Sequence, residues 1–535
     1  MGEMPKRRAS SPTESQSSHP AKARPAPKRG RFARAVHGIY QDDRKLQWVL
    51  LAFMVFCYLP LLGISWRLLL WGDPLNLTFN SMFEHLMHGR FDVDPQIVGW
   101  EGFVRNGRVY AYWGILPALL RFPLWILHRM NTDITFWSCL AAVCLKGMAK
   151  IRAVLLIRRH SAQNPAAQWA IGLMLGYVLL GGSATGDLRV TIYEETDFWA
   201  SAFAAIFVYF ALQGLIDRRF RDEALRWMAL CAGLTLLTRV TTGIGLILAI
   251  GLLLLVLAVQ AASASADGHR PALLRFGQAL FGLRTLIPTG MIAVLVAATG
   301  AVNYFRWGNP ATFANYYIYI CRYCVGDWVP IMQRYGLFNL ERIPFSLMYF
   351  FIPVWVFRGS DGRFFLENTQ QRIFHTVELP PSSFFLTDLV PLCFIVLLLV
   401  AVGRRRSRNS PRTMQAAAIG IGLLAPCVLI MTAISVAYRY RMEFYPEIDF
   451  LAFLGLYLTV TNPANLERFA RFRKWIAAAL AISIVGSLAS LTLLDLGTGG
   501  GTEREVSDGI VNYYRQAAAE KYHRLLAHYF TTHPR

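Results

Sequence analysis

Long runs of apolar residues dominate the pattern along the chain. A transmembrane helix needs roughly 20 consecutive, mainly apolar residues, and stretches of this kind recur almost to the end of the sequence. They are apolar on all sides, whereas the helices of a soluble bundle show apolar stripes. The pattern predicts an all-α, polytopic transmembrane helix bundle of about eleven spans, with short interfacial helices in its outer loops. The predicted spans are 47–69, 134–157, 166–184, 196–216, 224–241, 243–262, 284–303, 385–402, 414–436, 447–460 and 475–494.

The polar segments between these runs define the rest of the organisation. Residues 1–44 are rich in Pro, Ser, Lys and Arg, so we expect a disordered basic leader in the cytoplasm. Residues 45–494 form the predicted transmembrane domain, with outer loops at 71–133 and 304–384. Residues 495–535 are expected to form an amphipathic tail on the outer side.

Charge decides the predicted orientation. The chain has a net charge of +21, although only 16% of its residues are charged and 55% are hydrophobic. Lys and Arg gather in the leader and in short loops that an eleven-span topology places on the cytoplasmic side, which is the positive-inside pattern. Because topology explains the basic residues, we expect contact with membrane lipids and no binding of nucleic acid.

The first outer loop carries a pair of carboxylates beside two histidines. Asp92 and Asp94 face the same side if their segment is extended, because side chains repeat every two residues in a strand. Two such carboxylates can hold a divalent cation, or act as a base and its orienting partner. His85 and His88 share a face if their segment is helical, so they join Asp92 as candidate metal ligands. A solvated turn in which Asp92 caps nearby backbone is the alternative interpretation.

Three other segments of the outer loops have local signatures. Asn106-Gly107, between alternating apolar and polar residues, indicates a tight hairpin. Residues 113–128 are apolar and aromatic with Arg121 inside, which is typical of a helix that lies along the membrane interface. Residues 343–357 are too short and too closely bounded by Pro to span, so we expect an interfacial or re-entrant segment.

Ionisable residues also stand near the outer ends of later spans. Such residues are costly at membrane depth and mark functional sites, and Arg presents a planar fork suited to phosphate oxygens. Snorkelling towards lipid headgroups is the alternative for Arg239 and Arg441. The groups are Glu194, Glu195 and Asp197 at the start of the fourth span, Arg239 between the fifth and sixth, and Tyr438, Arg439 and Arg441 after the ninth.

The order of these features resembles the integral membrane glycosyltransferases of the C type, the GT-C superfamily. Members such as the protein mannosyltransferases and the aminoarabinose transferase share a first span, an outer loop with a D-x-D-like pair, an amphipathic segment and a many-helix bundle. Short strings along the chain resemble those of bacterial members. They are GRFDVD at 89–94, GRVYAYWGILPALL at 107–120, NYFRWGNP at 303–310, YGLFNL at 335–340 and RYRMEFYP at 439–446.

The resemblance implies an enzyme that transfers a hexosyl or pentosyl group from a polyprenyl-phosphate-linked donor. The implied acceptor is a cell-envelope lipid or glycan at the periplasmic face of the bacterial inner membrane. Outer-facing carboxylates would meet a lipid-linked sugar, since nucleotide sugars are made in the cytoplasm. No cofactor is required by this chemistry, and a divalent cation is compatible with it. The implied roles are base for Asp94 or Asp92, donor phosphate binding for Arg239, Arg439 and Arg441, and sugar or acceptor binding for Glu101, Glu194, Glu195 and Tyr438.

Two other functions share some of these features. A polysaccharide polymerase or ligase also uses outer-face Arg and lipid-linked substrates, but it places its key groups in a large late loop. A lipid or small-molecule transporter commonly has repeated halves and charges near the bilayer midplane. This chain has no repeat of fixed period, and its charges stand at the ends of the predicted spans.

Overall fold

The computed structural model describes most of the chain. The described residues are 38, 42–61, 74–161, 164–185, 190–264, 271–320, 328–352, 373–377, 382–404 and 410–499. The chain divides into two compact units, Met1–Leu46 and Gln47–Arg535, and the second contains every element discussed below except the first four residues of α2. Nearly all of the predicted leader and most of the predicted tail lie outside the described residues.

Every predicted span overlaps a helix, and residues 62–69 of the first span lie outside the described residues. The protein is an all-α membrane protein in which five of the described helices are long and apolar enough to cross a membrane, namely α11, α13, α15, α21 and α23. The count of eleven spans stays a prediction. The eleven helices are α2 (Asp43–Leu61), α8 (Thr135–Arg159), α9 (Pro165–Leu180), α11 (Ile192–Ile216), α12 (Asp222–Leu236), α13 (Val240–Ala264), α15 (Leu283–Trp307), α20 (Leu389–Gly403), α21 (Pro411–Thr432), α22 (Tyr445–Thr461) and α23 (Pro463–Gly499).

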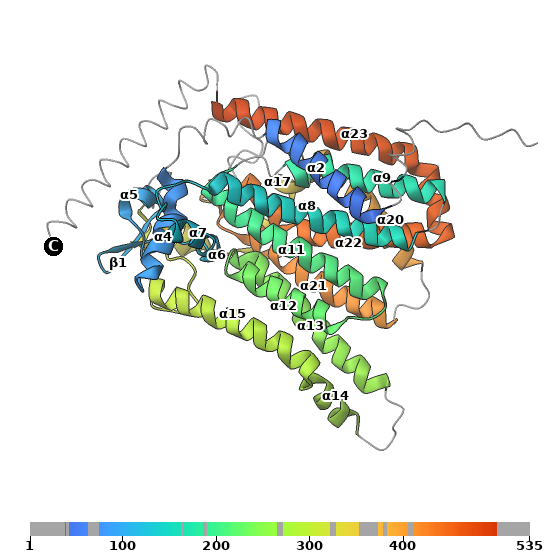
Figure 1. Ribbon diagram of the computed structural model, residues 1–535, viewed down its shortest axis with the longest axis horizontal. Coiled ribbons are helices and arrows are strands. Elements are labelled where there is room, and N and C mark those ends of the chain that lie inside the picture. The colour runs from blue at the N-terminus through green and yellow to red at the C-terminus, as the bar shows by residue number, and fades with distance from the viewer. Residues whose placement is uncertain are drawn as a thin grey trace, which may run out of the picture. The chain divides into compact units, whose positions relative to one another are not determined.

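The helices of the second unit pack as a bundle with one peripheral arm. Helices α8, α11, α12 and α13 lie side by side, and α13 packs along α21 (Figure 1). Helix α15 contacts mainly α12 and lies at the edge with α14 (Ala272–Leu280) at its end. Of the most apolar stretch of α15, only 17% is buried inside the protein, against 67% for the corresponding stretch of α11. One side of α15 is therefore left for lipid or for a ligand.

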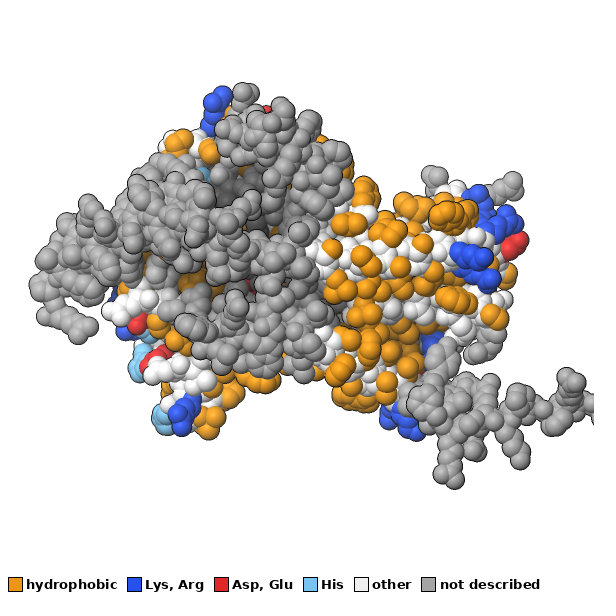
Figure 2. All heavy atoms as spheres, turned by 90° about the horizontal axis from the view of Figure 1, so that it is seen from above, with side chains coloured by type: hydrophobic (Ala, Val, Ile, Leu, Met, Phe, Trp, Pro, Cys, Tyr) orange, Lys and Arg blue, Asp and Glu red, His pale blue; other side chains and the backbone are white. Residues whose placement is uncertain are grey.

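The surface of the helical region is apolar. On the face shown in Figure 2, hydrophobic side chains cover the helices, and Lys and Arg side chains gather at one end. Large apolar side chains are exposed on this surface. Leu283, Val485 and Trp475, for example, are 74%, 66% and 75% exposed. A soluble monomer rarely exposes so much contiguous apolar area, so this surface suits contact with lipid chains.

The first outer loop folds into short elements. The predicted hairpin is confirmed: β1 (Phe103–Arg105) pairs antiparallel with β2 (Arg108–Tyr110). Its two turn residues, Asn106 and Gly107, have φ of 49° and 73°, as a type I′ turn requires. The other elements of the loop are η2 (Pro74–Leu77), α4 (Thr78–Met87), α5 (Pro95–Val98), η3 (Gly99–Glu101), α6 (Leu116–Leu119) and α7 (Phe122–Ile126).

Residues 113–128 differ from the expected single interfacial helix. They form α6 and α7, which are separated at Leu120-Arg121 because Pro123 has no N–H with which to continue the first helix. The side chains of Phe122 and Ile126 are about half exposed, in keeping with an interfacial position. Arg121, in contrast, is fully buried.

Further short elements complete the outer region. Residues 343–357 were expected to be interfacial or re-entrant. They begin with the nine-residue helix α17, and 353–357 lie outside the described residues. β3 pairs parallel with β4. The remaining elements are α10 (Gly182–Thr185), η5 (Tyr316–Ile318), α16 (Trp328–Tyr335), η7 (Leu340–Arg342), α17 (Ile343–Phe351), β3 (Thr376–Val377), α19 (Phe384–Thr387), β4 (Ser435–Val436) and η9 (Tyr438–Glu443).

The turn between α12 and α13 is braced by the first outer loop. Leu116 N donates to Leu237 O at 3.2 Å. A Cβ on Gly114 would overlap the carbonyl oxygens of Leu237 and Thr238. Only glycine allows the two backbones to approach so closely. The contact fixes the turn that carries Arg239.

We predict that Gly114→Ala destabilises the protein by about 1–3 kcal/mol, the usual cost of forcing extra volume into a packed contact. The measurement is the unfolding midpoint of the purified protein in detergent. Gly172→Ala on α9 is the matched control, because no atom lies within 4 Å of its Cβ position. An unchanged midpoint for Gly114→Ala would contradict the close approach.

Candidate functional site

A cavity lies between the first outer loop and the ends of several helices. Its volume is about 600 Å³. The walls combine apolar residues of α12, α13, α15 and α21 with aromatic and cationic side chains. We call this cavity the chamber. Its polar and aromatic lining includes Tyr112, Trp113, Tyr193, Arg239, Asn303, Arg306, Tyr316, Phe338, Arg439 and Tyr440.

Arg239 is held in the chamber by two carboxylates. It forms ion pairs with Asp197 of α11 and Glu443 of η9. Thr241 and Thr242 each donate to Glu443 at 2.5 Å. Both carboxylates are buried. A buried charge is tolerated when it is paired and hydrogen-bonded, so this arrangement fixes Arg239 and offsets its charge.

Arg439 is placed by aromatic rings. Its guanidinium lies 4.8 Å from the ring centre of Tyr193 and 5.2 Å from that of Tyr440. Within the described residues, no hydrogen bond or ion pair engages its N–H groups. Burial alone would lower the pKa of Arg439, but the nearby Tyr440, Tyr112 and Glu194 outweigh it and raise that pKa well above its usual value. Arg439 is therefore a cation with donors available to an anionic ligand.

Glu101 adjoins the same aromatic wall. Tyr319 Oη donates to its carboxylate at 3.0 Å. Burial raises the pKa of Glu101 above its usual value, and this rise is opposed by hydrogen bonds from Tyr193 and Tyr319 and by the charge of Arg439. Glu101 is thus electrostatically coupled to Arg439, although it does not line the chamber.

Asp92 is engaged by basic neighbours. Arg90 donates to both of its oxygens, at 3.1 and 2.5 Å, and His85 Nδ1 lies 3.6 Å away. Burial would raise the pKa of Asp92, but the neighbouring His85 and the hydrogen bonds from Arg90 outweigh it and hold that pKa well below its usual range. A carboxylate of this kind is a weak base.

Asp94, rather than Asp92, is the capping residue of this loop. Its Oδ1 accepts from Gln96 N at 2.9 Å at the start of α5, and its own N–H donates to Ser81 Oγ at 2.8 Å. Val93, between the two aspartates, packs in one apolar cluster with Trp113 and Ile115, which line the chamber. The loop with both aspartates is therefore anchored to the chamber wall, although neither carboxylate lines the cavity.

The two histidines do not converge. His85 lies beside Asp92, whereas His88 Nδ1 is 2.8 Å from Glu84 O of its own helix. Over the part of the chain that the structure describes, no three His, Cys, Asp or Glu side chains are grouped to hold a metal ion. Of the three predicted ligands, only His85 and Asp92 are neighbours.

The acidic residues at the start of α11 point in different directions. Glu195 is fully buried, pairs with Arg121 and accepts from Ser138 Oγ at 2.5 Å. Arg121 and Ser138 engage both of its oxygens, and its contact with sugar or acceptor stays a prediction. Glu194 accepts from Thr191 and lies close enough to Arg439 to raise its pKa. The pairing of Arg121 with Glu195 was not predicted, although an Arg within an apolar stretch was its signal in the sequence.

Arg441 and Tyr438 belong to a separate buried network. Arg441 Nη2 lies 2.6 Å from both Asp388 Oδ2 and Thr387 Oγ1, and Nη1 donates to Tyr438 Oη at 2.9 Å. Neither Arg441 nor Tyr438 lines the chamber. Of the three arginines predicted to bind phosphate, Arg239 and Arg439 line the chamber and Arg441 does not, and the phosphate-binding role itself stays a prediction. The buried Asp388 draws Arg441 to the junction of α19 and α20, and Asp388 was not among the predicted site residues.

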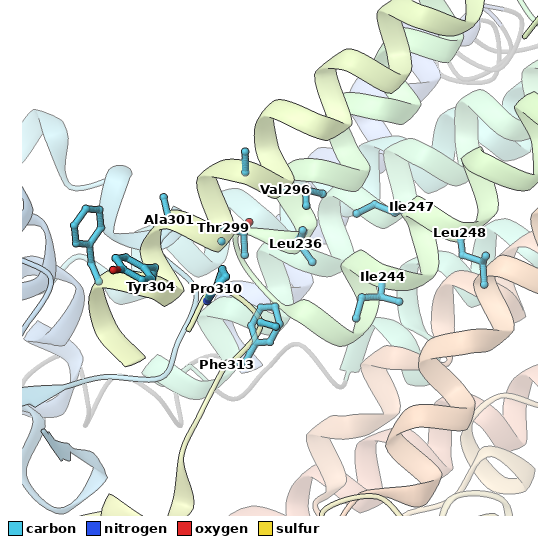
Figure 3. Close-up of a pocket in the computed structure, with 14 residues that line it drawn as sticks. Leu236, Ile244, Ile247, Leu248, Val296, Thr299, Ala301, Tyr304, Pro310 and Phe313 are labelled. Atoms are coloured by element: carbon cyan, nitrogen blue, oxygen red, sulfur yellow. The ribbon is translucent and has the colours of Figure 1, made fainter. Parts of the chain in front are cut away.

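An apolar groove adjoins the chamber. It has a volume of about 990 Å³ and lies between α12, α13 and α15 (Figure 3). The peripheral position of α15 leaves this space. The groove and the chamber share five lining residues, which are Leu236, Ile244, Thr299, Ala311 and Phe313.

Comparisons with known proteins add a distant structural likeness. No protein-family model matches the chain, and no curated protein sequence matches it. The structure resembles that of the Archaeoglobus fulgidus oligosaccharyltransferase tethered with an acceptor peptide, with 13% identity and a TM-score of 0.41. It also resembles the archaeal oligosaccharyltransferase AglB in complex with an inhibitory peptide and a dolichol-phosphate, with 13% identity and a TM-score of 0.39. The matches cover 83% and 85% of this chain but 55% and 57% of those chains. At these scores we draw no conclusion about function from the likeness.

The pKa of Glu101 gives a pH-dependent prediction. The carboxyl group of Glu101 has a pKa of about 4.5 in the unfolded chain and a higher pKa in the folded protein. Well below pH 4.5 the group is protonated in both the folded and the unfolded protein, so it costs no stability there. The cost appears as pH rises, because the unfolded chain ionises first. Glu101→Gln retains an oxygen that accepts from Tyr319. At each pH we subtract the unfolding midpoint of the unaltered protein from that of Glu101→Gln. We expect this difference to increase from pH 4 to pH 8. A difference that is constant with pH would contradict the raised pKa.

Proposed function

We propose that the protein is a membrane glycosyltransferase that takes its sugar from a lipid-phosphate-linked donor. The observation that carries this proposal is the apolar groove that shares one wall with a chamber containing Arg239 and Arg439. A long apolar chain fits the groove between α12, α13 and α15. An anionic head fits the chamber. The donor class is a polyprenyl phosphate carrying a sugar.

Arg439 is the proposed first contact of the donor phosphate. Its guanidinium is stacked on Tyr193 and Tyr440, and its fork matches phosphate oxygens. Arg239 already donates Nε and Nη1 to carboxylates, so it contributes with its remaining nitrogen. The aromatic side chains of the chamber, such as Trp113 and Tyr316, offer faces on which a sugar ring can rest.

Asp94 is the proposed base. The low pKa of Asp92 makes its carboxylate a poor proton acceptor, which leaves it to orient Arg90 and His85. In the reaction, an acceptor hydroxyl gives its proton to Asp94 as its oxygen bonds to the anomeric carbon. The bond from that carbon to the phosphate oxygen breaks, and polyprenyl phosphate leaves with the electron pair. Arg439 stabilises the charge on the leaving phosphate.

The acceptor and the location follow from sequence features. Basic loops on one side of the predicted topology favour a periplasmic site in the bacterial inner membrane. We propose a cell-envelope lipid or glycan as the acceptor, in line with the resemblance to C-type glycosyltransferases.

The groove is tested by filling it. Ala297 lines the groove but not the chamber. We expect Ala297→Trp to weaken binding of long-chain polyprenyl phosphate at least tenfold and to leave binding of a two-isoprene phosphate within about twofold. Burial of each CH₂ contributes about 0.8 kcal/mol, so loss of two or three buried groups suffices. Ala297→Ser is the matched control. Equal loss for both ligands would point to general damage, and no loss would remove the groove from the proposal.

The base is tested by Asp94→Asn in liposomes with polyprenyl-phosphate sugar donors. General-base catalysis contributes typically ~10²–10⁴-fold, so we expect transfer to fall by about that factor while donor binding persists. Asp92→Asn should reduce transfer less, because it acts through its neighbours. Full transfer by the double variant would refute the assignment of the base.

A further inference from the structure

The segment η9 presents three faces to three different partners. Side chains three residues apart eclipse one another in a 3₁₀-helix. Tyr440 and Glu443 meet Arg239, at the turn between α12 and α13. Tyr438 and Arg441 hydrogen-bond to one another and face the junction of α19 and α20. On the third face, Arg439 contacts the ring of Tyr193 and lines the chamber.

One anchor of η9 lies at its end. Glu443 is fully buried, and its carboxylate accepts hydrogen bonds from Arg239, Thr241 and Thr242. This anchor joins η9 to the start of α13. It fixes the segment at one point only, so a second contact is needed to set its rotation.

The second anchor is the pair Asp388–Arg441. Arg441 Nη2 lies 2.6 Å from Asp388 Oδ2, and both side chains are buried. Tyr177 of α9 donates to the other oxygen of Asp388 at 2.5 Å. Because removal of one partner would leave a buried charge unpaired, such a pair resists displacement. The rotation of η9 about its axis is thereby set.

Arg439 lies between the two anchors. Its guanidinium rests on rings and makes no hydrogen bond to a side chain in the described ranges. Ring contacts leave a long side chain room to shift, so its aim into the chamber depends on the backbone that carries it.

We propose that Asp388 and Arg441 form a positioning pair, which holds η9 so that Arg439 meets the phosphate of the ligand. This inference rests on the proposed function. It assigns Arg441 an indirect role, in place of direct contact with phosphate. Asp388 becomes a residue of functional importance although it touches no ligand.

A double-mutant cycle tests the pair. The probe is polyprenyl phosphate, and its Kd is measured with the full-length protein in lipid nanodiscs. Arg439→Gln removes a charge-assisted contact and should weaken binding about 10- to 100-fold. Arg441→Gln should weaken it about 5- to 10-fold. If Arg441 acts only through Arg439, the double variant binds within about twofold of Arg439→Gln. Multiplied losses would show that Arg441 contacts the ligand independently and would overturn the proposal.

Control variants separate positioning from general destabilisation. Leu225→Ala removes a fully buried side chain near the start of α12, at a residue that lines neither the chamber nor the groove. It should lower the unfolding midpoint and leave Kd unchanged. If Arg441→Gln does not fold, Tyr177→Phe loosens Asp388 while retaining the pair. It should then raise Kd about two- to threefold, and only when Arg439 is present.

The outcomes also separate this inference from the proposed function. Failure of the unaltered protein to bind polyprenyl phosphate contradicts the proposed function. Binding that is insensitive to both Arg441→Gln and Tyr177→Phe contradicts the positioning pair alone.

Discussion

The pairing of buried charges in an apolar bundle is the constraint on which the outer region depends. Arg239 joins three elements because Asp197 lies on α11 and Glu443 on η9. The same rule ties Arg121 to Glu195 and Arg441 to Asp388. An isolated charge is costly in an apolar environment, so each pair fixes a distance between helices that apolar packing leaves free to slide.

Within this framework Arg439 differs from the three arginines that pair with a buried carboxylate. Arg121, Arg239 and Arg441 each meet a carboxylate, whereas Arg439 meets rings. These paired arginines hold the structure together, whereas Arg439 turns open donors towards the chamber. The groove adds the apolar half of the site, because α15 stands apart from the bundle.

Several features of the site were predictable from short stretches of sequence. Alternation around Asn106-Gly107 defined the hairpin, and runs of apolar residues placed eleven helices. Arg239 and Arg439 were singled out because charges are rare beside such runs, and both line the chamber. The partner of each charge was not predictable. Arg441 and Arg439 stand two positions apart in the same string, yet they face a buried aspartate and an open cavity respectively.

The positions of the helices, and of the charged residues in apolar surroundings, can be predicted from the amino-acid sequence. Both are local properties, set by the length of an apolar run and by turn chemistry. Which charges neutralise one another depends instead on how distant segments pack. Arg239 and Glu443 are 204 residues apart, and their meeting depends on the packing of α11, α13 and α21. The rotation of a helix against its neighbours decides whether a side chain anchors the structure or contacts a ligand. A single sequence does not specify that rotation.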